Sequence, residues 1–353
     1  MHRRRFLALA STALAGGVAG ALWPSVAHAQ NPTLRFVDMH AHLGLKRELS
    51  IRRAMTVNGM LIVAENVIPD GPLSRHEKSG IRSFREAYPG ELRRNFQAAF
   101  RRRRVKAAQE GLIEITSVQA LDRVVGEQVP AVVLVSEGAD FLEGDIDYLA
   151  KVRAEGLVHL QLVHYYGKSG VGDISTEVPV HGGLTPFGKE VVRACNRLGV
   201  LVDVAHATSA GIEQALDIST KPLIYSHGHV SAGAPSVSHG ATAARAIHAP
   251  LAKKLADQGG VIGLWPLWYS YAHLNFYCDE LIRLAQTYGV EHVGIGTDMF
   301  GLPRTIIPSY EEFARLPDYL AQRGMAQKEI DAVLGGNYIR VLRQALAASD
   351  GTG

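Results

Sequence analysis

Cysteine is scarce in this chain, with only Cys195 and Cys278 among 353 residues. Two cysteines are too few for the disulfide framework that stabilises small secreted domains. An oxidising compartment would permit their pairing, but nothing in the sequence requires it. Cys195 lies inside the helix-like run FGKEVVRACNRLG, so we expect it in the core. The fold must rest on a hydrophobic core, for which this length and a 47% hydrophobic composition are sufficient.

An excess of charge of either sign is also lacking once the first 29 residues are set aside. Those residues contain three arginines and no acid, so 34 of the 37 basic residues remain against 34 acidic ones. A net charge of zero gives no general attraction to nucleic acid, and we expect no nucleic-acid partner. The run Arg101-Arg102-Arg103-Arg104 lies in a helical context and is expected to form a solvated helix face.

Long hydrophobic runs are absent after residue 29, where no stretch reaches the roughly 18 apolar residues needed to span a bilayer. Residues 1–29 differ, with three arginines at positions 3 to 5, a short apolar stretch and a small-x-small cleavage site at 27–29. This pattern resembles a twin-arginine export signal peptide. It predicts a periplasmic or otherwise exported protein with no stable membrane span after processing. An uncleaved N-terminal anchor is the alternative.

Eight short β-rich runs recur along the rest of the chain. Most are near-continuous apolar stretches, as is typical of strands buried on both faces, and several are followed by helical patterns. Eight βα units predict an α/β fold of the (β/α)8 TIM type, in which all strands end on one face. The runs are Phe36–His42, Gly59–Asn66, Ala131–Gly138, Val158–His164, Leu201–His206, Leu223–His227, Val261–Trp265 and His292–Asp298.

Five of these runs end in histidine or aspartate, and a sixth, Ala131–Gly138, has Glu137 one residue before its end. In a barrel such side chains would meet at one mouth, although they are far apart in sequence. Imidazoles and carboxylates gathered in this way suit zinc or a similar divalent metal. The candidates are His40, His42, Glu137, His164, His206, His227 and Asp298.

The first strand and the third supply the strongest candidates. His40 and His42 are two residues apart, so their side chains point to the same side of a strand and can hold one metal. Asp38 points the same way and could support them or cap the core. Glu137 is a good bridging ligand because its two oxygens can bind two metals at once. Its alternative role is that of a helix cap or an exposed carboxylate.

Later strand ends supply the remaining candidates. His206 and His227 end consecutive runs and together could hold a second metal. His229, two residues past His227, competes for that place. Asp298 could bind metal or carry the proton of a metal-activated water, and its alternative role is the N-cap of the next helix.

The surroundings of these residues resemble the membrane dipeptidase (renal dipeptidase) family of zinc peptidases. The likeness covers roughly Arg35 to Ala345, whereas residues 47–131 match poorly. It implies that residues 30–353 form a single metallo-dependent hydrolase barrel domain with dipeptidase activity. The likeness is strongest in VLVSEG, LQLVH, GGLTPFGKEVVRACNRLGVLVDVAH, PLIYSH, GVEHVGIGTDMFG and GGNYIRVL.

The resemblance also implies a binuclear zinc site, with two Zn²⁺ per chain bridged by Glu137. His40 resembles the ligand from the first strand, and His42 takes the second ligand position on that strand. His206 and His227 resemble the ligands of the second metal.

Three further roles follow from the same resemblance. His164 resembles the histidine that contacts the substrate and the tetrahedral oxyanion. Asp298 resembles the acid that shuttles the proton to the leaving amine. Arg245, in ARAIHAPLAKKLA, aligns with the arginine that clamps the substrate's C-terminal carboxylate.

The first strand departs from the family pattern, which usually reads His-x-Asp where this chain has His40-Ala41-His42. A neutral imidazole replaces an anion, so the site is one charge more positive. We expect tighter polarisation of the bound water or altered metal preference, and some drift in substrate. The predicted substrate is a dipeptide or a similar small, carboxylate-ended molecule. A deacylase, lactonase or phosphoesterase on the same barrel is the alternative, and a non-catalytic metal- or ligand-binding protein is a third hypothesis. A homodimer is left open.

Overall fold

The structure, a computed structural model, describes residues 36–46, 48–77, 80–231, 244–267, 273–301 and 309–347. All of them belong to one compact unit, Thr33–Gly353. The expected export signal, residues 1–29, lies outside the described residues, so export remains a prediction.

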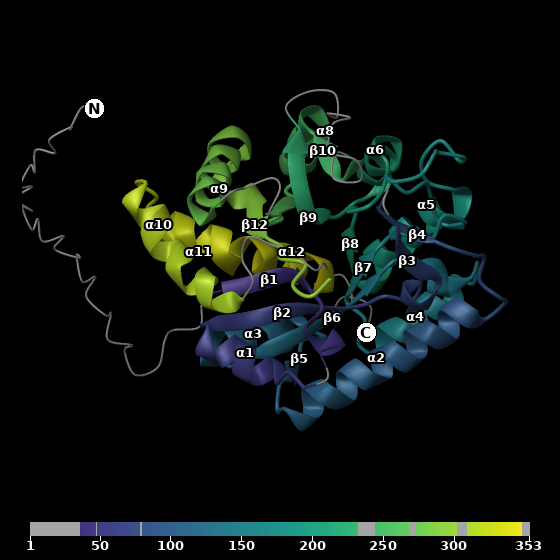
Figure 1. Cartoon of the computed structure of the whole chain (residues 1–353), viewed down its shortest axis with the longest axis horizontal. Coiled ribbons are helices and arrows are strands. Elements are labelled where there is room, and N and C mark those ends of the chain that lie inside the picture. The colour runs from purple at the N-terminus through teal and green to yellow at the C-terminus, as the bar shows by residue number, and fades with distance from the viewer. Residues whose placement is uncertain are drawn as a thin grey trace, which may run out of the picture. The chain divides into compact units, whose positions relative to one another are not determined.

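Eight parallel strands follow one another around a barrel in chain order (Figure 1). Each coincides with one predicted run, so the (β/α)8 prediction is confirmed. The ring closes where the amide of His42 donates to the carbonyl of Met299 (2.9 Å) and the amide of Asp298 donates to that of His40 (2.8 Å). The strands are β1 (Phe36–Ala41), β2 (Met60–Val67), β6 (Ala131–Glu137), β7 (His159–Gln161), β8 (Leu201–Asp203), β9 (Ile224–Ser231), β11 (Val261–Leu264) and β12 (Val293–Ile295).

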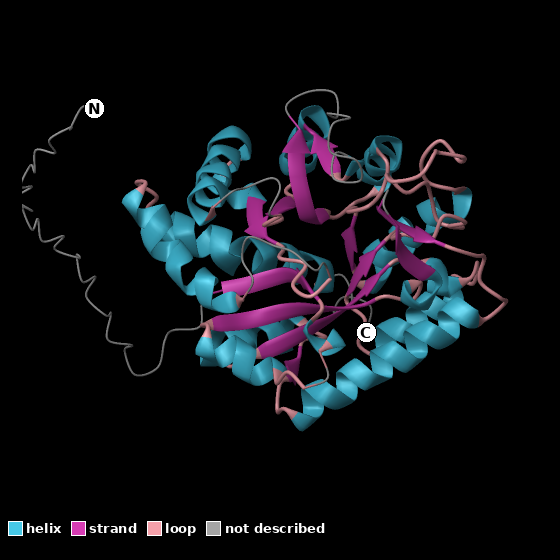
Figure 2. Ribbon diagram, viewed as in Figure 1, coloured by secondary structure: helices cyan, strands magenta, loops and turns pink. Residues whose placement is uncertain are grey.

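Helices surround the strands (Figure 2). Several begin at a hydroxyl cap, since the side chains of Ser50, Ser117, Thr185 and Thr208 each accept a hydrogen bond from the amide three residues on. No described helix is both long and apolar enough to cross a bilayer. The helices are α1 (Ile51–Val57), α2 (Glu91–Gln109), α3 (Val118–Glu127), α4 (Asp147–Ala154), α5 (Pro186–Leu198), α6 (Ser209–Ile218), α8 (Ala249–Asp257), α9 (Leu274–Tyr288), α10 (Leu316–Gln322), α11 (Gln327–Asp331) and α12 (Asn337–Leu346).

Helix α12 packs under the end of the barrel where the strands begin. Its apolar face forms one buried cluster with the first residues of several strands. The hydroxyl of Tyr338 on this helix lies 3.1 Å from Nδ1 of His159 on β7. The core also contains both cysteines, Cys195 on α5 and Cys278 on α9, which are buried and unpaired.

The segment 47–131, which the family resemblance left uncovered, adds elements beyond the βα repeat. An antiparallel hairpin of β3 (Ser74–Glu77) and β4 (Gly80–Ser83) follows β2, and β5 (Ile113–Glu114) pairs with β6. The hydroxyl of Ser83 accepts a hydrogen bond from the amide of Gly167 (3.0 Å). This contact ties the hairpin to the loop that follows β7, at the C-terminal side of the barrel.

The arginine run on α2 is only partly the solvated face that the sequence predicted. Arg101, Arg102 and Arg104 are exposed. The prediction was wrong for Arg103, which is 7% exposed and whose Nε lies 2.6 Å from Oε1 of Glu65 on β2. Four consecutive helical residues cannot all face solvent, because they span a full turn.

Two glycines let β9, β11 and β12 approach one another closely. A Cβ atom at Gly263 on β11, or at Gly296 just after β12, would overlap the carbonyl oxygen of Ser226 on β9. Ser226 directly precedes His227, so this contact sets how far β9 lies from its neighbours beside the barrel mouth.

Replacing Gly296 by alanine should lower the free energy of unfolding by about 1–3 kcal/mol, because the added methyl would force β9 to shift. Gly126 is the matched control, since it lies on the exposed face of α3 with nothing within 4 Å of an added Cβ. Gly126→Ala should raise the free energy of unfolding by about 0.5–1 kcal/mol. Urea unfolding followed by circular dichroism measures both, and equal stability of the two variants would contradict this packing.

Candidate metal centre

The carboxylate of Glu137, at the end of β6, lies at the centre of the barrel mouth. Its Oε1 is 3.4 Å from Nε2 of His40 and 3.1 Å from Nε2 of His206, and its Oε2 is 3.4 Å from Nε2 of His42. Nε2 of His227 lies 3.7 Å from Oε1. All five side chains are buried. The structure thus brings together the five residues that the sequence predicted as metal ligands.

Two further predicted residues face this cluster. Nε2 of His164 is 3.4 Å from Oε1 of Glu137, and Oδ1 of Asp298 is 3.0 Å from Nε2 of His42. Asp298 has a φ of 52°, a left-handed conformation that is uncommon outside glycine. The hydrogen bond that its backbone amide donates to the carbonyl of His40 helps to hold this conformation. None of the described helices begins at Asp298, so the N-cap alternative finds no support there.

Burial and neighbouring charge fix the ionisation of the cluster. Burial first, and then the positive charge of Arg245, hold the pKa of His206 well below its usual value. The pKa of His227 is lowered in the same way by burial and then by the charges of His40 and Arg245. Burial opposes ionisation of Glu137, yet nearby histidine charges hold its pKa well below the usual range. His206 and His227 are therefore neutral and lie beside an ionised carboxylate.

These donors fit a divalent metal. Neutral imidazole nitrogens and carboxylate oxygens are the ligands that zinc prefers besides thiolate. Three groups of described residues have their ligand atoms within 4.8 Å of one another, close enough to share one ion. The groups are His40, Asp203 and His227; His40, His42 and Asp298; and Glu137, His164 and His206.

Arg245 also reaches this cluster, as the sequence predicted for a substrate-binding residue. It is 2% exposed, and its Nη2 donates to Nε2 of His227 (2.9 Å) while its Nη1 donates to the hydroxyl of Tyr165 (3.1 Å). The guanidinium carbon lies 5.0 Å from the ring centre of Trp265, a cation–π distance. The hydroxyl of Tyr225 donates to the Arg245 carbonyl (2.8 Å), which fixes the backbone. A buried, permanently charged group therefore lies beside the candidate ligands.

Sequence reasoning missed the residues that orient these side chains. Nδ1 of His164 lies 2.8 Å from Oδ1 of Asp70, whose Oδ2 accepts the amide of Tyr165 (3.1 Å). The hydroxyl of Ser226 lies 2.8 Å from Nδ1 of His227 and 3.3 Å from Nδ1 of His40. Asp70 could have been found as an acid in Pro-Asp-Gly shortly after the second strand. Ser226 carries no signal beyond its place before His227.

Two residues left open by the sequence now have defined positions. The carboxylate of Asp38 accepts hydrogen bonds from the hydroxyls of Thr297 (2.5 Å) and Tyr310 (2.6 Å) and from the amide of His40 (3.1 Å). It therefore supports the backbone of the first strand from within the core. The ring of His229 stacks on Trp265, with centroids 5.9 Å apart, outside the groups that surround Glu137.

The cluster opens into a cavity of about 150 Å³. Part of its wall comes from the segment after β2 and from the β3–β4 hairpin. That volume suits a small molecule and leaves no room for a folded polypeptide. The wall residues from this segment are Ile68, Gly71, Ser74, His76 and Ile81.

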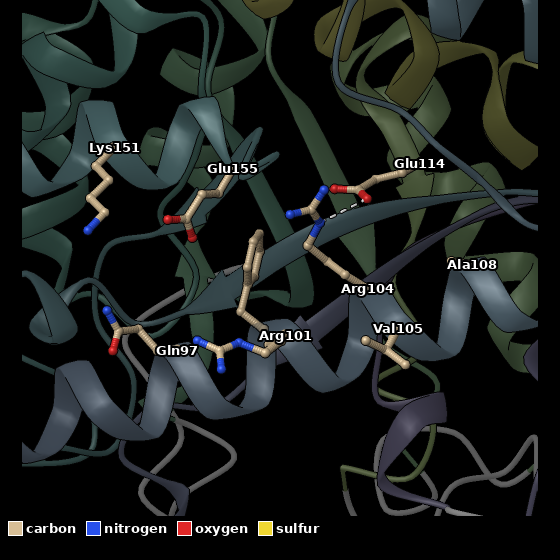
Figure 3. A pocket seen from close by; sticks show the side chains of 9 residues that line it. Gln97, Arg101, Arg104, Val105, Ala108, Glu114, Lys151 and Glu155 are labelled. Carbon is tan, nitrogen blue, oxygen red and sulfur yellow. Dashed lines mark hydrogen bonds and ion pairs between the residues drawn. The ribbon is translucent and has the colours of Figure 1, made fainter.

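Larger hollows exist elsewhere on the molecule, so volume alone does not mark the site. One of about 560 Å³ lies against α2 (Figure 3) and contains an ion pair between Nε of Arg104 and Oε2 of Glu114, 3.1 Å apart. No histidine is among the described residues that line it. It therefore lacks the ligand chemistry found at the barrel mouth.

The sequence pattern of the membrane dipeptidase family, peptidase family M19, matches residues 75–352. The chain belongs to this family. Dipeptidase tcpJ of Claviceps purpurea is 28% identical over 218 residues, which are 59% of this chain and 49% of that protein. Dipeptidase 3 of Mus musculus is 27% identical over 255 residues, 69% and 49% of the two chains. The chain thus spans about half the length of the curated family members it matches.

Solved structures share the fold. An amidohydrolase from Pseudomonas aeruginosa superposes with a TM-score of 0.71 at 21% identity, over 88% of this chain and 96% of its own. The metallo peptidase dipeptidase AC, of family M19, gives 0.75 at 18% identity over 89% and 99%. A Rhodobacter sphaeroides metallo peptidase, liganded with a phosphinate mimic of the dipeptide L-Ala-D-Ala, gives 0.74 at 16% over 89% and 100%. At such identities the likeness establishes the family's barrel fold.

Zinc added to chelator-stripped protein should raise Tm, because the ligands converge only in the folded chain. The free energy of unfolding should rise by about 2.7 kcal/mol at a free zinc concentration 100-fold above Kd. His227→Ala should diminish this gain, while the control His229→Ala, which alters a ring stacked on Trp265, should retain it. Differential scanning calorimetry measures the response, and an undiminished zinc effect in His227→Ala would exclude His227 as a ligand.

Proposed function

We propose that this chain is an exported zinc-dependent dipeptidase that hydrolyses the amide bond of dipeptides or similar small, carboxylate-ended substrates. One observation carries the proposal. A buried carboxylate with four imidazoles around it lies beside a buried arginine, next to a small cavity at the mouth of a barrel of the membrane dipeptidase family.

The metal set proposed is two zinc ions that share Glu137. His40 and His42 would hold the first ion, and His206 and His227 the second. Bound zinc supplies Lewis acidity toward a carbonyl oxygen and lowers the pKa of water. The convergence of the five side chains and the neutral state of His206 and His227 support this assignment.

His164 is proposed to stabilise negative charge that develops on the substrate's carbonyl oxygen. Burial opposes protonation of this imidazole, but the negative charges of Asp70 and Glu137 outweigh it and raise the pKa of His164. Asp70 engages Nδ1, which leaves Nε2 facing the cavity side as a donor. A donor held in place before the reaction lowers the barrier more than one that must reorient.

Asp298 and Arg245 complete the proposed machinery. Asp298, whose Oδ1 lies 3.0 Å from Nε2 of His42, is proposed to take a proton from water and pass it to the leaving amine. Arg245 can offer paired N–H donors to a substrate carboxylate, and its burial strengthens that attraction. The phosphinate mimic of L-Ala-D-Ala on the Rhodobacter sphaeroides metallo peptidase supports a small, carboxylate-ended substrate for this chain as well.

Export is also part of the proposal. The arginine-led segment at residues 1–29 supports a periplasmic address through a twin-arginine route. A homodimer stays a prediction without a described interface.

A second candidate is another amidohydrolase activity on the same centre. Two observations favour this second candidate. His42 has an imidazole where the family pattern has an anion, and the β3–β4 hairpin lines the cavity. A deacylase, lactonase or phosphoesterase would not require a free carboxylate on its substrate, so substrate chemistry separates the two candidates.

The deciding assay uses purified protein from Gln30 onward, either zinc-loaded or chelator-stripped. Its substrates are dipeptides with L or D C-terminal residues and the corresponding C-terminal amides. We expect zinc-dependent cleavage of the free acids and at least a roughly tenfold loss on the amides, because a charge-assisted contact to Arg245 contributes about 1.5–3 kcal/mol. Chromatography of the amino acid products measures both. Cleavage of acids and amides at equal rates would move the assignment to the second candidate.

Substitutions at His164 and Arg245 should affect different kinetic constants, kcat for His164 and KM for Arg245. His164→Ala should lower kcat by about 100- to 1,000-fold with little change in KM, because it removes an oxyanion donor. Arg245→Ala should raise KM by about 10- to 100-fold, and Arg245→Lys should recover part of the loss because it keeps the charge without the paired donors. Steady-state kinetics on one dipeptide measure both. A wild-type kinetic profile in either variant would refute that residue's role.

A further inference from the structure

Several buried polar atoms have no hydrogen bond within the described part of the chain. Among them, beside the first strand, are Nδ1 of His42 and Oε2 of Glu65. Glu65 on β2 pairs in register with Ala41 on β1, which directly precedes His42, and both side chains are about 1% exposed. An imidazole that binds a metal through Nε2 usually presents its Nδ1–H to a carboxylate, a carbonyl or water. Glu65 supplies a carboxylate on the strand next to His42.

The other oxygen of Glu65 grips the loop that follows His42. Oε1 accepts the amide of Gly44 (2.8 Å) and lies 2.6 Å from Nε of Arg103, whose Nη1 donates to the carbonyl of Gly44 (2.7 Å). A Cβ atom at Gly44 would overlap the guanidinium of Arg103. The ion pair therefore binds both the amide and the carbonyl of Gly44, two residues after the candidate ligand His42. The space at this position fits only glycine.

Glu65 also adds negative charge where the centre has little. The candidate ligand set contains four imidazoles and one carboxylate, so two divalent ions would leave it strongly positive. Burial raises the pKa of Glu65, and the charge of Arg103 offsets only part of that rise. The carboxylate form is inferred from the ion pair itself, in which Oε1 lies 2.6 Å from Nε of Arg103. An anion behind an imidazole makes the ring a stronger metal donor.

We infer that Glu65 is a positioning residue for His42, which fixes the loop after β1 and strengthens the imidazole as a metal donor, and that Arg103 holds Glu65 in that place. The inference rests on the proposed function, because it takes His42 as a ligand. It extends the site to α2, the helix whose arginine run the sequence assigned to solvent.

The rival explanation is that the Glu65–Arg103 pair only stabilises the fold. Glu65→Gln alone would leave a buried, unpaired guanidinium, which strongly destabilises a folded protein. The double variant Glu65→Gln/Arg103→Gln removes both charges and keeps hydrogen-bonding groups. Glu65→Asp is the second variant, since it keeps the ion pair's charges and draws the carboxylate back by one methylene. Glu114→Gln is the matched control because Glu114 also pairs with an arginine of α2, Arg104, away from the barrel mouth (Figure 3).

The measurement is zinc affinity by chelator competition in folded protein, checked by circular dichroism. His42→Ala identifies which zinc equivalent depends on His42. For that equivalent we expect the double variant to bind zinc about 10- to 100-fold more weakly, Glu65→Asp to be weakened in the same direction, and Glu114→Gln to match wild type. In a His42→Ala background the added double substitution should have no further effect, because substitutions that act through the same ligand are not additive.

Wild-type zinc affinity in the folded double variant, or in Glu65→Asp should the double variant fail to fold, would overturn the inference. So would a full loss of affinity that persists in the His42→Ala background. Wild-type protein that binds zinc but cleaves no dipeptide would overturn the proposed function and leave this inference standing. Wild-type protein that binds no zinc would overturn both.

Discussion

The buried Glu137 carboxylate is the interaction around which the mouth of this barrel is arranged. A buried charge is stable only when neighbouring groups compensate it, and here five imidazoles from four different strand ends surround it. The hydrogen bonds that close the ring, between β1 and the end of β12, run through His40, His42 and Asp298 themselves. Barrel closure and site geometry therefore depend on the same few backbone contacts, and a shift in one would disturb the other.

The sequence predicted the parts that follow from period and position. Buried parallel strands are near-continuously apolar, so all eight could be recognised, and a barrel's strand ends must meet. That rule alone selects Glu137, His206 and Asp298 without any contact information. Arg245 was reached by resemblance only, because it lies beyond a strand end and its burial cannot be recognised locally. The family assignment came from the same motifs and is confirmed.

Residues that act through tertiary contacts could not be predicted. Asp70 matters because it meets His164, 94 positions along the chain, and Trp265 because it stacks over Arg245. Arg103 differs from its neighbours in the arginine run only in the direction in which it leaves the helix. Its partner Glu65 lies inside an apolar strand run, where a carboxylate has no local explanation. Each of these depends on which elements pack together, and the sequence pattern does not encode that directly.

The packing of α12 under the barrel restricts how substrate can enter the cavity and how products can leave it. Within the described residues, the end at which the strands begin is filled by an apolar cluster, so the cavity communicates with solvent at the opposite end. In a hydrolase of this shape, the substrate and both products would pass through the same opening. A product that stays bound would then exclude the next substrate, and the rate of product release would set an upper limit on turnover however fast the bond is broken.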